Sequence, residues 1–239
     1  MHRNETPPFL GAIRAAGPDS EAFLQGQLTQ DLRRVVDMPG LAGYCSPKGR
    51  LLAVMDLRRA DDGFVLQMHR GVLEATLKRL RMFVMRSRVT LEPHPPAPFD
   101  GDENDWKLAG IVHGVPVVYP ETLDHFVPQM VNLDQLGAIG FDKGCYTGQE
   151  VVARLHYLGN LKRRMFRMRS EAPAAPGASV FDSAGDAQAA GEVVDCARGP
   201  DRFELSVVLQ LSHASSSGLR LATMDGPMLL HAVPKKSET

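Results

Sequence analysis

The sequence predicts an α+β protein that ends in a small all-β region, and three observations predict this class. Apolar residues repeat at helical spacing between residues 71 and 87, and two strand-like runs flank an Asp-Asp-Gly turn. After Arg164, short alternating segments are separated by Gly, Pro, Ser and Asp. With 239 residues, 44% of them hydrophobic, the chain can bury more than one compact core.

The N-terminal half alternates strands and helices. FLGAIRAAG has the composition of a strand, and Asp19 or Ser20 can cap a helix directly after it. LLAVMDLRRADDGFVLQM predicts a hairpin, because Asp62 and Gly63 tolerate the backbone angles of a tight turn. Residues 71–87 then predict an amphipathic helix, since their Lys and Arg side chains fall mostly away from the apolar stripe.

The C-terminal part predicts strands only. The runs MFRMR, AGEVVDCA, RFELSVVLQL and PMLLHAV alternate apolar and polar residues and are bounded by turn-forming residues. Between the two parts, EPHPPAPFDGDEND combines prolines with acidic residues that cannot pack, so we expect a linker there. The whole pattern is typical of a helix-and-sheet region followed by a β-barrel or sandwich.

Charge and cysteine content limit the classes of function. The 27 Lys and Arg residues nearly balance the 28 Asp and Glu residues, so no global field attracts nucleic acid or a membrane. No run is long and apolar enough to span a bilayer and the N-terminus lacks a signal-peptide pattern, so we expect a cytoplasmic location. Three widely spaced cysteines match neither a disulfide framework nor a zinc ribbon, and no metal site is predicted.

The stretch FDKGCYTGQEVVARLHYLGNLKRR carries the strongest chemical signal. The Gly144–Cys145 step precedes an apolar helical pattern, so we expect Cys145 in the first turn of a helix. The helix N-terminus and the ammonium of Lys143 would both favour the thiolate, which makes a reactive thiol plausible. Gly144 and Gly148 would let a ligand approach the backbone.

Other residues of the stretch are given supporting roles. Gln149 shares a helix face with Cys145, and Glu150 and Arg154 are spaced to pair on the helix surface. His156 would lie about 16 Å from the thiol along the helix axis, too far to act as its base. The alternative is that a lone cysteine is a small buried apolar residue, and we retain that interpretation for Cys45 and Cys196.

The block KGCYTGQE followed by AR resembles the signature of the YgfZ family of folate-binding proteins. GPDSEAFLQGQLTQD, YCSPKGRLLA, DWKLAGIVHGVPVV, FVPQMVNLDQLGAIGF and YLGNLKRR resemble further family blocks in the same order, over most of residues 10–165. The resemblance implies the fold of the glycine cleavage system T-protein, an aminomethyltransferase whose domains surround a folate-sized opening and end in a β-barrel.

The resemblance also implies the site. Cys145 corresponds to the essential family cysteine, and Trp106 to a tryptophan that contacts folate, where an indole face can stack on a flat ring. Leu10 stands where the family has a second tryptophan. We therefore expect tetrahydrofolate or a one-carbon derivative as the cofactor. The candidate residues are Cys145 and Lys143 for catalysis, and Trp106, Gly144, Tyr146, Gly148, Gln149, Glu150 and Arg154 for binding.

The domain organisation follows from the same comparison. We expect a folate-binding composite region at 1–165, with a reduced middle subdomain at about 46–92 and a linker at about 93–104, and a β-barrel-like domain at 166–239. Longer family members carry a further half-domain after Leu91. We therefore expect the middle domain here to be halved, with only its first half retained, at about residues 46–92. An uncovered sheet edge or face could then pair with a second copy, as a homodimer.

The expected role is that of an accessory protein rather than an enzyme. The family is implicated in maintaining iron–sulfur enzymes, including those that modify tRNA, so such enzymes are the expected clients. The first alternative is a folate-dependent one-carbon or aminomethyl transferase, which would need a carboxylate near the folate. The second is a tRNA-binding module using two basic clusters, around residues 78–88 and 162–169, although those arginines also suit folate carboxylates.

Overall fold

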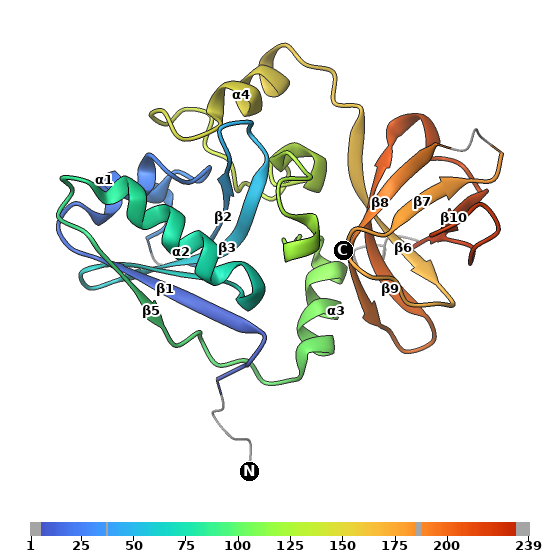
Figure 1. The fold of residues 1–239 in the computed structure, drawn as a ribbon, viewed down its shortest axis with the longest axis horizontal. Helices are drawn as coiled ribbons and strands as arrows, with labels where there is room; N and C mark the ends of the chain where they lie inside the picture. The colour runs from blue at the N-terminus through green and yellow to red at the C-terminus, as the bar shows by residue number, and fades with distance from the viewer. Residues whose placement is uncertain (1–5, 37, 185–187, 233–239) are drawn as a thin grey trace, which may run out of the picture. The chain divides into compact units, whose positions relative to one another are not determined.

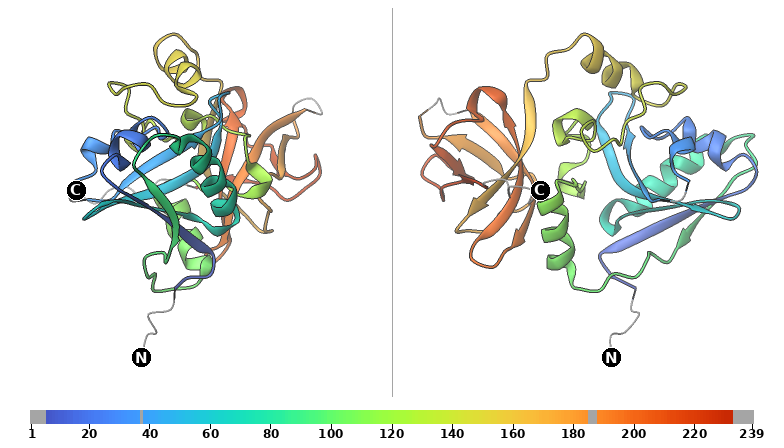
Figure 2. Two further views of the ribbon diagram at one scale, coloured as in Figure 1. Left: turned by 60° about the vertical axis from the view of Figure 1, so that its left-hand side comes forward. Right: turned by 180° about the vertical axis from the view of Figure 1, so that it is seen from behind.

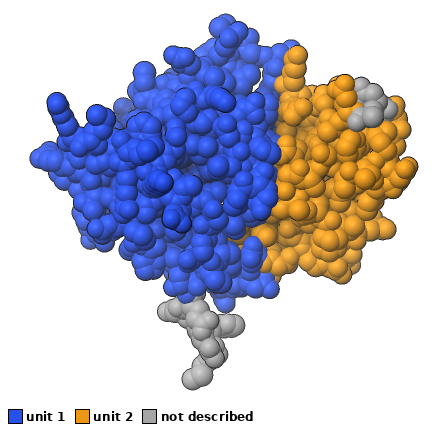
Figure 3. Space-filling model, in the orientation of Figure 1, with its two compact units in different colours: residues 1–103, 117–161 blue, residues 104–116, 162–239 orange. Residues whose placement is uncertain are grey.

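A computed structural model describes residues 6–36, 38–184 and 188–232. The chain forms two compact units, each built from two stretches of sequence. The first unit contains residues 1–103 and 117–161, and the second contains residues 104–116 and 162–239 (Figure 3).

The first unit contains a five-stranded antiparallel sheet with the strand order β2-β3-β4-β1-β5. Its strands are β1 (Leu10–Ala16), β2 (Gly40–Cys45), β3 (Leu51–Ala60), β4 (Gly63–His69) and β5 (Thr90–His94). The central strands bury apolar side chains on both faces, which explains why β1 and β3 are nearly continuous apolar runs.

Helices of the first unit flank this sheet. Helix α2 (Arg70–Val84) lies along the sheet and contacts β1, β3, β4 and β5 (Figure 1). Helix α1 (Ser20–Gln25) packs against β4, and α4 (Gln149–Tyr157) follows the cysteine motif. Short 3-10 helices are η1 (Leu32–Arg34), η2 (Pro120–Thr122) and η3 (Pro128–Val131).

The local predictions for this unit are confirmed in position and type. The first strand is β1, and α1 begins at Ser20 with Asp19 at its N-cap. Asp19 makes no capping bond, because its carboxylate binds Arg88 instead. The predicted hairpin is β3–β4, and the predicted amphipathic helix is α2, which ends where Met85 adopts a positive φ of 42°.

The second unit begins with helix α3 (Glu103–His113), which starts at the boundary between the units. An antiparallel sheet with the order β10-β7-β8-β9-β6-β11 follows. Its strands are β6 (Arg163–Ser170), β7 (Ser179–Asp182), β8 (Ala189–Arg198), β9 (Phe203–Gln210), β10 (Leu219–Leu221) and β11 (Leu230–His231), with η4 (Leu211–His213) after β9.

The sheet of the second unit curls into a barrel (Figure 2). Residues 227–229 form backbone hydrogen bonds with β10, and β11, which follows at once, pairs with β6. The short segment of residues 227–231 thereby bonds to β10 with its first part and to β6 with its second. Apolar side chains from the strands fill the interior, among them Met168, Val193 and Val207.

Candidate functional site

The cysteine motif is a loop that leads into α4, and the helix starts later than the sequence predicts. Helix α4 begins at Gln149, with Gly148 at its N-cap in the left-handed conformation (φ 84°). Cys145 lies four positions before the first helical residue, so the expectation that it occupies the first helical turn is wrong. The chain must turn at Gly148 before it can become helical, and only then do the apolar positions of the helix begin.

Gly148 is required because the loop packs closely against the β2–β3 turn. A Cβ atom at Gly148 would lie 2.6 Å from the Ser46 carbonyl oxygen and 3.1 Å from the Cβ of Cys45. The contact is reciprocal, since a Cβ atom at Gly49 (φ 70°) would lie 2.6 Å from the Cβ of Val151. Two glycines with positive φ therefore allow the two backbones to meet.

The same turn is also held from a third segment. The Ser46 hydroxyl donates to the Asp124 carboxylate at 2.6 Å, and Asp124 itself has a positive φ of 62°. The backbone of Leu51 exchanges hydrogen bonds with Asp124 and Phe126. Segments near residues 46, 124 and 148 are thus fixed to one another, which gives the motif loop a rigid base.

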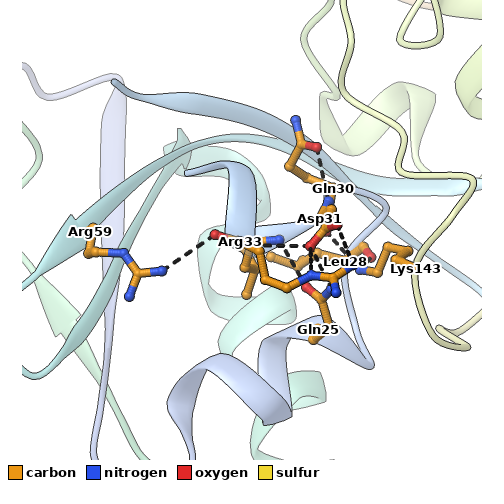
Figure 4. A network of polar contacts seen from close by, with 8 residues as sticks. Gln25, Leu28, Gln30, Asp31, Arg33, Arg59 and Lys143 are labelled. Atoms are coloured by element: carbon orange, nitrogen blue, oxygen red, sulfur yellow. Dashed lines mark hydrogen bonds and ion pairs between the residues drawn. The ribbon is translucent and has the colours of Figure 1, made fainter. Parts of the chain in front are cut away.

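Lys143 joins the motif to the region between α1 and η1. Its ammonium donates 2.7 Å hydrogen bonds to the backbone carbonyls of Leu28 and Gln30 (Figure 4), and it lies 5.1 Å from the centre of the Tyr146 ring. The side chain is buried, and this burial lowers its pKa to about 8. These contacts fix the loop in place, whereas activation of Cys145 by Lys143 stays a prediction.

A polar network surrounds the Lys143 anchor. The Asp31 carboxylate accepts hydrogen bonds from Gln25 and, at two nitrogen atoms, from the Arg33 guanidinium (Figure 4). These bonds, with that of Arg33 the largest contribution, hold the pKa of Asp31 well below its usual range. Gln25 also accepts from the backbone N–H of Leu32 at 2.9 Å. These residues cap η1, and no motif in the sequence pointed to them.

A hollow of about 610 Å³ opens beside this network. It is lined by Pro18, Glu21, Ala22, Gln25, Arg33, Asp142 and Gly144, and we call it the Gly144 hollow. A Cβ atom at Gly144 would meet no atom within 4 Å, and Gly144 has no positive φ. The fold therefore does not require glycine at this position, in contrast to Gly148.

The three cysteines differ sharply in exposure. Cys145 is exposed, Cys196 is half-buried and Cys45 is buried. Burial raises the pKa of Cys45 to about 12 and also raises that of Cys196. At neutral pH the thiols of Cys45 and Cys196 are therefore protonated and poorly reactive.

The other predicted binding residues of the motif have mixed surroundings. Tyr146 is buried, which raises its pKa, and it exchanges hydrogen bonds with Gln149 through its backbone N–H and C=O. Glu150 and Arg154 are exposed on α4, but within the part of the chain that the structure describes no ion pair joins them. Tyr146 and Gln149 thus shape the loop, and a binding role for these residues stays a prediction.

The end of α4 carries a small aromatic cluster. The His156 ring stacks on Phe141 with a centroid distance of 3.6 Å, and Tyr157 packs edge-on against both rings. The contact holds the start of the motif stretch against its helix.

Trp106 lies on α3, where it is half-buried, and it belongs to the second unit. The cysteine motif belongs entirely to the first unit. The position expected for the second family tryptophan is held by Leu10, which is fully buried in β1. The role of Trp106 in folate binding stays a prediction.

A half-buried carboxylate, that of Asp56, was not among the predicted site residues. Asp56 lies within the apolar strand β3, opposite Leu41 and Gln67, and burial raises its pKa while nearby Arg58 opposes that rise. An acidic residue inside an otherwise apolar run, LLAVMDL, was the available sequence signal. Groups with such shifted pKa values are candidates for proton transfer.

Two further findings concern the described ranges as a whole. Within them, no three His, Cys, Asp or Glu side chains are grouped so that they could hold a metal ion. Of the helices in these ranges, none combines the length and the apolar character that crossing a bilayer requires.

Comparison with known proteins identifies relatives and a shared fold, although no protein-family model matches the chain. An uncharacterized protein of Haemophilus influenzae is 33% identical over 192 residues, which cover 64% of this chain and 69% of the relative. The tRNA-modifying protein YgfZ of Edwardsiella ictaluri is 30% identical over 234 residues, covering 70% of this chain and 71% of the relative. Its namesake in Colwellia psychrerythraea is 27% identical over 226 residues, covering 68% and 70%.

A solved structure shares the fold of this chain. The glycine cleavage system aminomethyltransferase T of Bartonella henselae superposes with a TM-score of 0.70 at 12% sequence identity, covering 94% of this chain and 83% of that protein. The T-protein-like α+β fold predicted from the sequence is therefore confirmed.

Proposed function

This chain belongs to the YgfZ family, as its motifs predict, and from this premise we propose that it is a folate-binding accessory protein that acts through Cys145. Its clients in this proposal are iron–sulfur enzymes, including those that modify tRNA. The relatives named tRNA-modifying protein support the last point.

The exposure of Cys145 within an otherwise anchored motif is the observation that carries the proposal. Lys143 and Tyr146 are buried, and Gly148 is locked against the β2–β3 turn, yet the thiol between them is exposed. A cysteine needed only for packing would be buried, as Cys45 is. An exposed thiol on a rigid loop can act as a nucleophile or as a ligand for iron.

The Gly144 hollow is the part of this loop region that suits a folate. Its volume of about 610 Å³ lies within the usual range for small-molecule sites. The Asp142 carboxylate suits the N–H donors of a pterin, and the Arg33 guanidinium, whose Nε and one terminal nitrogen already bind Asp31, has a further nitrogen that suits a carboxylate of the glutamate tail. A bound reduced folate would supply a one-carbon carrier beside Cys145.

Cells that lack this chain provide the test of the role of the thiol. Cys145→Ser should fail to restore the activity of an iron–sulfur enzyme and the level of a modified tRNA nucleoside, whereas Cys196→Ser should restore both. Folding of each purified variant is compared by circular dichroism. Full restoration by folded Cys145→Ser would refute a chemical role for the thiol.

Folate binding is tested separately, at Gly144. Gly144 lines the hollow and a Cβ atom there would meet no atom within 4 Å, so we expect Gly144→Leu to keep the native stability and to lose affinity for tetrahydrofolate by at least about tenfold. Unchanged affinity would show that the hollow is not the folate site.

A transferase is the second candidate, and Asp56 is the observation that favours it. One-carbon transfer needs a carboxylate near the folate, and Asp56 is a half-buried carboxylate whose pKa burial raises. Asp56 does not line the Gly144 hollow, so this candidate requires folate to bind closer to β3. If the chain is such an enzyme, Asp56→Asn should abolish folate-dependent transfer of a one-carbon unit while folate binding persists. Absence of any transfer by the wild-type chain would leave the accessory role as the account of this site.

Direct tRNA binding is less favoured by the charges. Arg167 and Arg169, from the second basic cluster, both bind the buried Glu204 carboxylate, which neutralises part of their field. A tRNA-binding module should show affinity that falls steeply with salt concentration. A steep dependence measured with unmodified tRNA would favour that function.

A further inference from the structure

A second cavity lies in the first unit, away from the cysteine motif. It has a volume of about 300 Å³ and is lined by residues of α2, β2, β3 and the segment after η2: Tyr44, Leu52, Ala75, Thr76, Lys78, Arg79, Met82 and Leu123. We call it the Tyr44 pocket. None of these residues belongs to the Gly144 hollow.

Two polar atoms of the pocket lining lack partners. The Tyr44 hydroxyl and the Nε of Arg79 are both buried, and neither has a hydrogen-bond partner within the described residues. Tyr44 is fully buried, and the Arg79 side chain lies within reach of its hydroxyl, so that both its charge and its hydrogen bonding oppose the rise that burial causes in the Tyr44 pKa. The Tyr44 oxygen can therefore accept from Arg79, and what the pair lacks is an acceptor for the Tyr44 O–H and for the Arg79 Nε–H. Buried polar groups are nearly always satisfied, so two orphans at one cavity indicate a missing acceptor.

The charge and shape of the pocket restrict that acceptor. Arg79 is permanently cationic and Lys78 lies beside it, so an anionic acceptor is favoured over a neutral one. Leu52, Met82 and Leu123 make most of the remaining wall apolar. At about 30 Å³ for each water-sized group, the volume suits roughly ten non-hydrogen atoms, which is far fewer than a folate contains.

We propose that the Tyr44 pocket binds a small apolar carboxylate, whose oxygens accept hydrogen bonds from the Tyr44 hydroxyl and from Arg79. The apolar body of the ligand then contacts Leu52, Met82 and Leu123. This site is separate from the proposed folate site, and it does not depend on folate binding.

Octanoate is a suitable probe, with octanol and octylamine as neutral and cationic controls. Calorimetry should give saturable octanoate binding at or below about 1 mM, and each control should bind at least about tenfold more weakly. Protein labelled with ¹³C at the methionine methyl groups should show a shift of the Met82 signal, which Met82→Leu assigns. Octanoate binding equal to that of octanol, or an unmoved Met82 signal, would overturn the proposal.

Variants separate a ligand site from a packing defect. Arg79→Met should weaken octanoate binding at least tenfold, whereas Arg86→Met, at an exposed position outside the pocket, should leave it unchanged. Tyr44→Phe should also weaken binding, yet raise the melting temperature of the unliganded protein, because it removes a buried hydroxyl without a partner. Unchanged binding by Arg79→Met and Tyr44→Phe would overturn the assignment, and so would complete displacement of octanoate by tetrahydrofolate.

Discussion

Gly148→Ala should destabilise the first unit strongly, because two penalties act at this position. An alanine held at φ 84° is strained by about 1 to 2 kcal/mol. Its Cβ would also lie 2.6 Å from the Ser46 oxygen and 2.9 Å from the Gly49 Cα, and relieving such overpacking costs about 1 to 3 kcal/mol. The free energy of unfolding should fall by roughly 2 to 5 kcal/mol in total.

Gly144→Ala is the matched control from the same motif. Its Cβ meets nothing within 4 Å and the backbone needs no positive φ, so the free energy of unfolding should be unchanged or higher by about 0.5 kcal/mol. The gain would come from the lower conformational entropy of the unfolded chain.

Pulsed alkylation across a urea series measures this difference in the correct unit. Cys45 is buried in the first unit and reports its unfolding, while Cys196 reports the second unit in the same sample. For a slope of about 2 kcal/mol per M, the Cys45 midpoint of Gly148→Ala should fall by about 1 to 2.5 M, with Cys196 unchanged. Equal Cys45 midpoints for the two variants would refute the packing of Gly148 against the β2–β3 turn.

Three further predictions concern pH, folate and assembly. Burial lowers the Lys143 pKa from 10.5 to about 8, so between these pH values the unfolded state binds more protons than the folded state. The free energy of unfolding, measured relative to that of Lys143→Met, should therefore rise by on the order of 2 to 3 kcal/mol from pH 8 to 10.5. A flat difference in urea midpoints over this range would contradict it. The role predicted for Trp106 is tested by its fluorescence, which tetrahydrofolate should quench saturably, and no response up to about 1 mM would refute that role. The exposed Met85 and the edge strand β5 favour a homodimer, so light scattering at micromolar concentration should give twice 26.1 kDa, and a clean monomer would contradict pairing.

Local sequence patterns predicted those elements whose cause is local. The Asp62–Gly63 turn and the apolar stripe of α2 specify the β3–β4 hairpin and its following helix, and alternation specifies β6, β8 and β9. Helix α3 was missed, because the acidic residues at its start are typical of a linker and its apolar side chains make only a weak stripe. What ties this helix to the second unit is non-local, since the Asn104 side chain exchanges hydrogen bonds with the backbone of Arg198.

The candidate site depends on contacts that no local pattern contains. The carbonyls that hold Lys143 are 113 and 115 residues away along the chain, so the sequence presented this lysine as a free cation beside the thiol. The late start of α4 has a similar origin, since Gly148 takes a left-handed conformation where it meets the turn at Ser46. In contrast, the motif alone was enough to single out Cys145 from Cys45 and Cys196, and Cys145 is the exposed one of the three.

The central claim is that Cys145 is an accessible, reactive thiol beside a folate site, and the rate of its alkylation tests this most directly. Native protein is treated with iodoacetamide, with and without tetrahydrofolate, and each cysteine is followed by mass spectrometry. We expect Cys145 to react at least about tenfold faster than Cys196, Cys45 to react only on unfolding, and tetrahydrofolate to slow Cys145 alone. A Cys145 that reacts no faster than Cys196, or at a rate that folate leaves unchanged, would contradict the account.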